Sequence, residues 1–225
     1  MPRQLTADDI RSFGFTVEEL RPRIFAITDF LTSDETRDIF TEVDSYSEEH
    51  WRHRYLEEMR RSCLEKFGRD DIEALVEEGL LEVTWNFADK NSAFLNKDLA
   101  ETMRLRAQQF FDVLHQDLEL NGFLVVHRQY EGTDLKEHYD QYSDKLIEYA
   151  GVLYINKGYS NGELFFRNFD LEIQPEPGTL VIFPGTEEYM HGVRHVGPGP
   201  VRYNLPTFIK RRDPDGSMAG WANFG

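Results

Sequence analysis

The sequence predicts an α+β fold in which helical segments come first and then brace an antiparallel β-sandwich or barrel. Before residue 121, apolar residues recur at helical spacing in several segments. From Phe123 onward, short runs rich in Val, Ile, Leu, Phe and Tyr are separated by turns containing Gly and Pro. Because an amphipathic helix must bury its apolar face, we expect the helices to pack on one face of a sheet.

The length of 225 residues fits one domain. We expect a single domain over 1–225, in which 1–121 is a mostly helical support with early strands. The segment 122–212 is then the β-core that carries the candidate site, and 213–225 is a tail. No internal repeat or long linker divides the sequence.

The net charge of −16 argues against nucleic-acid binding, because an acidic surface repels phosphate backbones. The apolar run Tyr149–Ile155 is too short to span a bilayer, so no membrane association is expected. Residues 1–10 are polar and do not resemble a signal peptide. Cys63 is the only cysteine, which excludes an intrachain disulfide and suits a reducing cytoplasm.

The first elements are predicted from short local patterns. Two short helices are expected within 6–20, the second at Val17–Leu20, and a strand at 23–27. Thr32 and Glu35 have the spacing of a capping box and predict the start of a helix. The apolar stripe of that helix is Ile39, Phe40 and Val43.

The patterns in the middle of the chain predict further helices and one strand. Trp51, Tyr55, Met59 and Cys63 recur every four residues, which predicts one face of a helix over 48–66 and places Cys63 in packing. The remaining elements are a helix at 70–78 ending at Gly79, a half-buried strand at 81–87, and a long helix marked by Leu95, Leu99, Met103, Phe110, Leu114 and Leu118.

Seven strands are expected after residue 121. They are 123–130, 146–156, 163–169, 171–174, 179–183, 192–196 and 201–209. The intervening segments 131–137 and 184–190 are expected to be loops, which together with the segment 46–120 would set the specificity of a site in the β-core.

A candidate metal site is indicated by His138 and Asp140. Side chains two residues apart on an extended strand point to the same face, so both could bind one ion. A second imidazole, from His191 or His195, would complete two histidines and one carboxylate, the donor set of non-heme Fe(II) oxygenases. Arg202 follows on the next apolar run and is suited to hold a carboxylate through two parallel hydrogen bonds.

These residues and their neighbours resemble the iron- and 2-oxoglutarate-dependent dioxygenases, in the prolyl-4-hydroxylase-like branch. The matching motifs, in chain order, are Tyr130-x-Gly132, His138-Tyr139-Asp140, Leu153-Tyr154-Ile155-Asn156, Gly162-Glu163-Leu164, Pro177-Gly178-Thr179-Leu180-Val181-Ile182-Phe183-Pro184, His191-Gly192-Val193 and Arg202-Tyr203. The resemblance is close over 120–210 and loose over 20–45, and 46–120 matches no motif of the family. It implies a double-stranded β-helix, that is, a jelly-roll or cupin-like core.

The resemblance also implies the cofactors and residue roles. Fe(II) would be held by His138, Asp140 and His191, with 2-oxoglutarate and O2 as cosubstrates. His191 is preferred to His195 because it lies eleven residues before the arginine, close to the family spacing. Arg202 would pair with the distal carboxylate of 2-oxoglutarate.

Two tyrosines and the metal carboxylate have family roles as well. By family position Tyr154 would hydrogen-bond the same distal carboxylate. Tyr130 would lie near the iron, although its motif is one residue shorter than in the family. Halogenases of this superfamily replace the carboxylate ligand with a small residue, so Asp140 favours hydroxylation.

The implied reaction is hydroxylation of an aliphatic C–H in an amino-acid-like small molecule or a prolyl residue, with release of succinate and CO2. One alternative is a cupin-like metal-dependent dioxygenase or isomerase that does not use 2-oxoglutarate and does not need Arg202. Another is a non-catalytic binding module. Nucleic-acid demethylation of the AlkB type shares the metal motif but conflicts with the acidic charge.

Overall fold

The structure is a computed structural model that describes residues 3–52, 56–81, 90–115 and 117–212. Within these ranges, no helix is long and apolar enough to cross a membrane. Helices and antiparallel strands are both present, which confirms the α+β prediction.

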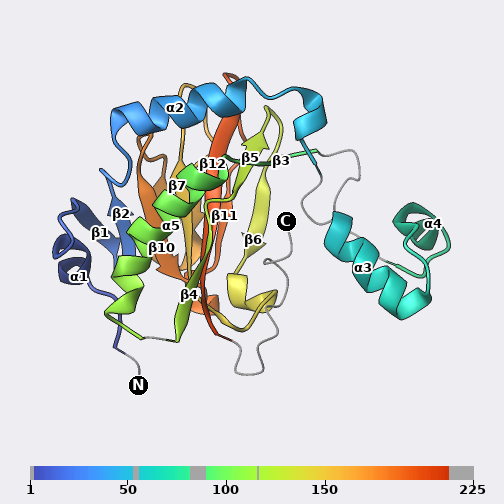
Figure 1. The fold of residues 1–225 in the computed structure, drawn as a ribbon, viewed down its shortest axis with the longest axis horizontal. Helices are drawn as coiled ribbons and strands as arrows, with labels where there is room; N and C mark the ends of the chain where they lie inside the picture. Colours follow the sequence, from blue (N-terminus) through green and yellow to red (C-terminus); the bar gives the residue numbers. More distant parts are fainter. Residues whose placement is uncertain (1–2, 53–55, 82–89, 116, 213–225) are drawn as a thin grey trace.

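Two antiparallel sheets form the body of the molecule (Figure 1). The large sheet has the order β1-β2-β10-β7-β12-β5-β3, with β4 also pairing with β12, and the small sheet has the order β6-β11-β8-β9. The strands are β1 Val17–Arg21, β2 Ile24–Ile27, β3 Ser92–Phe94, β4 Leu118–Gly122, β5 Val125–Gln129, β6 Leu135–His138, β7 Ile147–Tyr154, β8 Leu164–Phe166, β9 Leu171–Ile173, β10 Leu180–Pro184, β11 His191–Val193 and β12 Arg202–Arg211.

Helices α2 and α5 lie across one face of the large sheet (Figure 1). The helices are α1 Ala7–Arg11, α2 Ser33–Asp44, α3 Leu56–Phe67, α4 Ile72–Glu77 and α5 Lys97–Asp112. The 3₁₀ turns are η1 Glu48–His50, η2 Asp140–Tyr142, η3 Arg167–Phe169 and η4 Glu187–Tyr189. The capping box predicted at Thr32 and Glu35 is confirmed at the start of α2.

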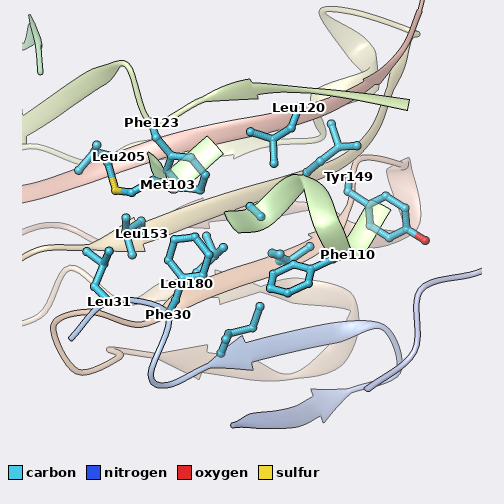
Figure 2. Close-up of a cluster of buried hydrophobic side chains, with 14 of the residues drawn as sticks. Phe30, Leu31, Met103, Phe110, Leu120, Phe123, Tyr149, Leu153, Leu180 and Leu205 are labelled. Carbon is cyan, nitrogen blue, oxygen red and sulfur yellow. The ribbon is translucent and has the colours of Figure 1, made fainter. Parts of the chain in front are cut away.

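The main core fills the space between these helices and the sheet (Figure 2). Leu180, Leu153 and Leu205 form a row across β10, β7 and β12, because Leu153 is paired with both of the others. Met103 and Phe110 of α5 pack against this face. Neighbouring residues on a strand point to opposite faces, so Tyr154 belongs to a second cluster on the other face of the sheet.

The second cluster joins the two sheets. Val181 and Phe183 of the large sheet pack there with Leu164 and Phe166 of the small sheet. The interior between the sheets is therefore separate from the helix-covered core, and the predicted site residues of β7 and β12 face this interior.

The helix predicted at Val17–Leu20 is wrong, because this segment is strand β1. It pairs with β2, which confirms the strand predicted at 23–27. Val17 is buried and pairs with Ile27, whereas Glu18 and Glu19 are exposed. Pairing with β2 at the end of the large sheet therefore prevails over the helical preference of the two glutamates.

The helix predicted over 48–66 is wrong in its first part. Trp51 follows η1 and packs in the main core, where its ring stacks on Tyr203 at a centroid distance of 6.0 Å. Cys63 lies on α3 and is buried in a different, small cluster with Ile72 and Leu75. The four-residue spacing therefore joined residues of two separate elements and did not mark one helix. The predicted packing role of Cys63 is confirmed. Gly79, with φ +71°, follows α4 as expected.

The long helix ends earlier than expected. Helix α5 stops at Asp112, and Leu118 begins strand β4, where it still packs in the main core. Each of the seven strands predicted after residue 121 overlaps an observed strand. The segment expected as a loop at 131–137 contains most of β6, whose first three residues are exposed and show no apolar alternation. The strand predicted at 81–87 falls almost wholly outside the described residues.

Candidate metal centre

His138, Asp140 and His191 come together from three elements. The Nε2 atom of His138 lies 3.9 Å from Asp140 Oδ1, and the Nε2 atom of His191 lies 3.8 Å from Asp140 Oδ2. The two imidazole ring centroids are 4.5 Å apart. One ligand atom from each residue lies within 4.8 Å of the others, so the three residues could hold one metal ion.

Backbone pairing positions the two imidazoles. His138 ends β6, His191 begins β11, and the two residues are direct partners in the antiparallel ladder. The prediction that Asp140 shares a strand with His138 is wrong, because Asp140 opens the 3₁₀ turn η2. This turn is fixed by Gln141 N, which donates to Gly185 O at 2.9 Å, so the carboxylate is directed to the imidazoles by the turn.

Each imidazole is oriented by a backbone carbonyl. His138 Nδ1 lies 2.8 Å from Lys136 O, and His191 Nδ1 lies 3.0 Å from Tyr189 O. A carbonyl oxygen can only accept, so each Nδ1 carries the proton and each Nε2 keeps its lone pair for a metal. Burial, and then the neighbouring His138, lower the pKa of His191 to about 3, which keeps that imidazole neutral.

The three residues differ in access to solvent. Asp140 and His191 are buried, whereas the side chain of His138 is 36% exposed. The rings of Phe183 and Phe166 lie 4.5 and 5.7 Å from the ring of His191. The centre is therefore lined by aromatic groups on the inner side and open on the side of His138.

A second group of polar side chains lies in the same interior and is called here the arginine–tyrosine cluster: Arg202, Tyr154 and Tyr159. Arg202 is 1% exposed, and its Nη1 donates to Gln129 Oε1. Its guanidinium carbon lies 5.2 Å from the ring centroid of Tyr154 and 5.9 Å from that of Tyr159.

Four buried atoms of the cluster lack a hydrogen-bond partner within the part of the chain that the structure describes. They are Nε and Nη2 of Arg202 and the hydroxyls of Tyr154 and Tyr159. Burial raises the pKa of Tyr154 to about 12, although Arg202 acts in the opposite direction, so this hydroxyl remains a donor. Unsatisfied buried donors are costly. A fixed cation with two free N–H groups and two hydroxyls fits a carboxylate ligand.

Other predicted residues take different positions. Tyr130 is 42% exposed and its ring lies 5.0 Å from the guanidinium of Arg128, so it is not brought into either group. His195 was expected within the strand 192–196, but it lies beyond the end of β11 and is exposed. Asn204, two residues after Arg202 on β12, is buried with its Nδ2 3.5 Å from Gln129 Oε1.

Sequence reasoning missed Gln129 and Tyr159. Gln129 is paired with Arg202 across β5 and β12, so strand pairing would have found it once the register was known. Tyr159 lies in the loop between β7 and β8, where no periodic pattern indicates the direction of a side chain.

Residues 124–210 match the family model of the 2OG-Fe(II) oxygenase superfamily. This segment is a 2OG-Fe(II) oxygenase domain. The matched range contains the three candidate metal ligands and the arginine–tyrosine cluster. No curated protein matches the chain.

Solved structures with the same fold include two prolyl hydroxylases. One is a viral collagen prolyl hydroxylase from Paramecium bursaria Chlorella virus-1, with a TM-score of 0.54 and 14% identity, covering 85% of this chain and 90% of the other. Another is a Pseudomonas putida prolyl-4-hydroxylase, with a TM-score of 0.55 and 17% identity, covering 92% and 99%. A second structure of the viral enzyme is a 2OG complex. It has a TM-score of 0.53 and 16% identity, and the match covers 85% of this chain and 97% of the other. The double-stranded β-helix fold expected from the sequence is thus confirmed.

The residues of the oxygenase domain fit the cofactors of the superfamily. Two neutral imidazoles and one carboxylate form a donor set that suits Fe(II). The free donors around Arg202 suit a buried carboxylate such as that of 2-oxoglutarate. Fe(II), 2-oxoglutarate and O2 are therefore the cofactor and cosubstrates of this domain.

Proposed function

We propose that this oxygenase domain hydroxylates an aliphatic C–H of an amino-acid-like small molecule or of a prolyl residue in a peptide. One observation carries the proposal: the His138–Asp140–His191 group and the arginine–tyrosine cluster lie between the same two sheets. When bound, Fe(II), 2-oxoglutarate and O2 supply an oxidation that yields succinate, CO2 and a hydroxylated substrate.

His138, Asp140 and His191 would hold Fe(II). The carbonyls of Lys136 and Tyr189 fix the two imidazoles so that both Nε2 atoms are directed to the metal. Three protein donors leave coordination positions open for ligands. The carboxylate of Asp140 is retained, which supports hydroxylation and not halogenation.

Arg202 and Tyr154 would hold the distal carboxylate of 2-oxoglutarate. Arg202 is oriented by Gln129, which accepts from Nη1 and leaves Nε and Nη2 for a ligand. Tyr130 stays a prediction for the surroundings of the iron, and its exposed position beside Arg128 gives no support to it. The aromatic rings of Phe166 and Phe183 exclude water from the inner side of the metal centre.

The substrate class rests on the fold and on charge. The solved relatives are named prolyl hydroxylases, which supports a small-molecule or peptidyl substrate for this domain. The net charge of −16 argues against a nucleic-acid substrate. The single cysteine supports a cytoplasmic setting. We also propose that residues 1–225 form a single domain.

The experiment is an anaerobic titration of the purified protein with Fe(II), with and without 2-oxoglutarate, followed through the visible metal-to-ligand charge-transfer band. We expect a band only when both are present, and its loss in Arg202→Ala. Iron binding without a band would instead support a cupin-like enzyme that does not use 2-oxoglutarate. Absence of iron binding would leave a non-catalytic binding module. The free Nε and Nη2 atoms of Arg202 argue against the cupin-like alternative, since an enzyme that does not use 2-oxoglutarate gives these two buried donors no acceptor.

A further inference from the structure

Tyr159 is a buried tyrosine that no motif of the family resemblance includes. It lies in the loop between β7 and β8 and is 5% exposed. Its ring lies against the guanidinium of Arg202, on which the ring of Tyr154 also lies. Over the described ranges, its hydroxyl has no hydrogen-bond partner. A phenol buried in this way loses its hydration without a replacement, which indicates a missing acceptor.

The backbone of Tyr159 is held by the loop that leads into β12. Ser160 N donates to Pro198 O at 2.9 Å, and Gly197 N donates to Ser160 O at 2.7 Å. Gly199 has φ +146°, and a Cβ atom there would lie 2.4 Å from the Cα atom of Tyr159. Only glycine permits this close approach, so the two loops are fixed against each other.

Gly162 supports the side chains of Tyr159 and Arg202. It has φ +76°, and an added Cβ would lie 3.5 Å from Cε2 of Tyr159 and 3.6 Å from Cδ of Arg202. The aromatic ring and the arginine stem therefore meet over the same residue. The three side chains of the arginine–tyrosine cluster are arranged before a ligand binds, which lowers the entropic cost of binding.

We propose that the Tyr159 hydroxyl is a third donor to the distal carboxylate of 2-oxoglutarate, beside Arg202 and Tyr154, and that it selects a dicarboxylate over a monocarboxylate 2-oxo acid. This inference rests on the proposed function. A carboxylate has about four lone-pair sites and can accept from all three side chains. A 2-oxo acid that ends in a methyl group would leave these donors unsatisfied, and such a site rejects it strongly.

The test compares two ligands in two proteins. The parent chain and Tyr159→Phe are loaded anaerobically with Fe(II) and titrated with 2-oxoglutarate or 2-oxopentanoate, which has a methyl group in place of the distal carboxylate. We expect Tyr159→Phe to raise the dissociation constant of 2-oxoglutarate roughly ten- to hundredfold. The dissociation constant of 2-oxopentanoate should be the same in both proteins. Tyr142→Phe, which removes an exposed hydroxyl, is the matched control and should change neither constant.

The outcomes separate this inference from the function on which it rests. No charge-transfer band in the parent chain with either ligand would overturn the proposed function and this inference with it. A parent chain that binds 2-oxoglutarate, with Tyr159→Phe binding it equally well, would overturn this inference alone. Equal weakening of both ligands would also overturn it, because a donor to the distal carboxylate cannot act on a ligand that lacks one.

Thermal stability gives a second readout. Without ligands, Tyr159→Phe should melt at the same temperature as the parent or higher, since it removes a hydroxyl that has no partner among the described residues. The increase in melting temperature that 2-oxoglutarate produces should be smaller in the variant. Tyr159→Leu, tested in the same way, supplies the comparison should the phenylalanine variant not fold. An unchanged ligand-induced increase in both would contradict the inference.

Discussion

His138 and His191 face each other as direct partners in the antiparallel ladder of β6 and β11, with their ring centroids 4.5 Å apart. The metal centre therefore depends on the distance between these two strands. Gly192, next to His191, sets part of that distance, since a Cβ atom there would lie 2.7 Å from Leu135 O on β6.

Gly192→Ala should weaken metal binding by pushing β6 away from β11. The added methyl meets a backbone atom, which cannot move aside without the strand, so we expect about a 10- to 100-fold loss in Fe(II) affinity. Crowding of this kind also lowers the free energy of unfolding by about 1–3 kcal/mol. Gly151→Ala is the control, because its methyl would meet Thr207 and Val181 O on the large sheet. It should lower stability alone, and equal metal affinities in both variants would contradict the prediction.

His191→Ala should abolish stoichiometric Fe(II) binding, whereas His195→Ala should retain it. His191 supplies a buried, oriented Nε2 atom close to Asp140, whereas His195 is exposed beyond the end of β11. Anaerobic titration of both variants with Fe(II) measures the difference. The reverse pattern, with metal lost only in His195→Ala, would show that the sequence spacing and the structure both indicated the wrong histidine.

Phe110→Ala should lower the free energy of unfolding by about 3–5 kcal/mol, the usual cost of removing a buried aromatic ring. Phe110 is fully buried on α5, and its ring packs against Phe15 at 5.2 Å and Phe13 at 5.9 Å. Urea unfolding measures this change. Leu105→Ala, at a residue 52% exposed on the same helix, should stay within about 0.5 kcal/mol of the parent. Similar losses in both variants would mean that α5 does not pack as described.

Glu35→Gln should reduce the loss of stability in acid. The hydrogen bond from Arg106 is the main cause that lowers the pKa of Glu35 from 4.5 to about 2. A carboxyl with a lowered folded-state pKa stabilises the fold above its unfolded value, and this contribution is lost as the pH falls from about 4.5 to about 2. The variant should show a shallower decline of unfolding free energy in that window. Arg106→Gln should behave similarly, and a slope equal to that of the parent in both would refute the assignment.

Much of the site could be predicted because its chemistry is concentrated in few residue types. His138, Asp140 and His191 were predicted from donor chemistry and from motif order, and the structure brings their ligand atoms together. The reason given for His138 and Asp140 was wrong, since the two residues lie on a strand and a following turn.

Sequence reasoning failed where long-range pairing decides the structure. Val17–Leu20 carries no local sign of a strand and becomes one by pairing with β2. Trp51 and Cys63 share a spacing but not a cluster, because Trp51 follows η1 whereas Cys63 lies on α3. Gln129 and Tyr159 reach Arg202 only through strand register and loop packing, and neither is encoded in local spacing.

Leu153 and Tyr154 are neighbours on β7 that face the main core and the interior between the sheets, respectively. A slip of β7 by one residue would exchange them, placing a leucine beside Arg202 and a tyrosine hydroxyl among the hydrocarbon side chains of the helix-covered face. The leucine row Leu180–Leu153–Leu205 makes that slip costly. The packing that holds the helices to the sheet therefore also keeps ligand recognition in register, so a chain that folds with the wrong register loses its core and its cosubstrate pocket together.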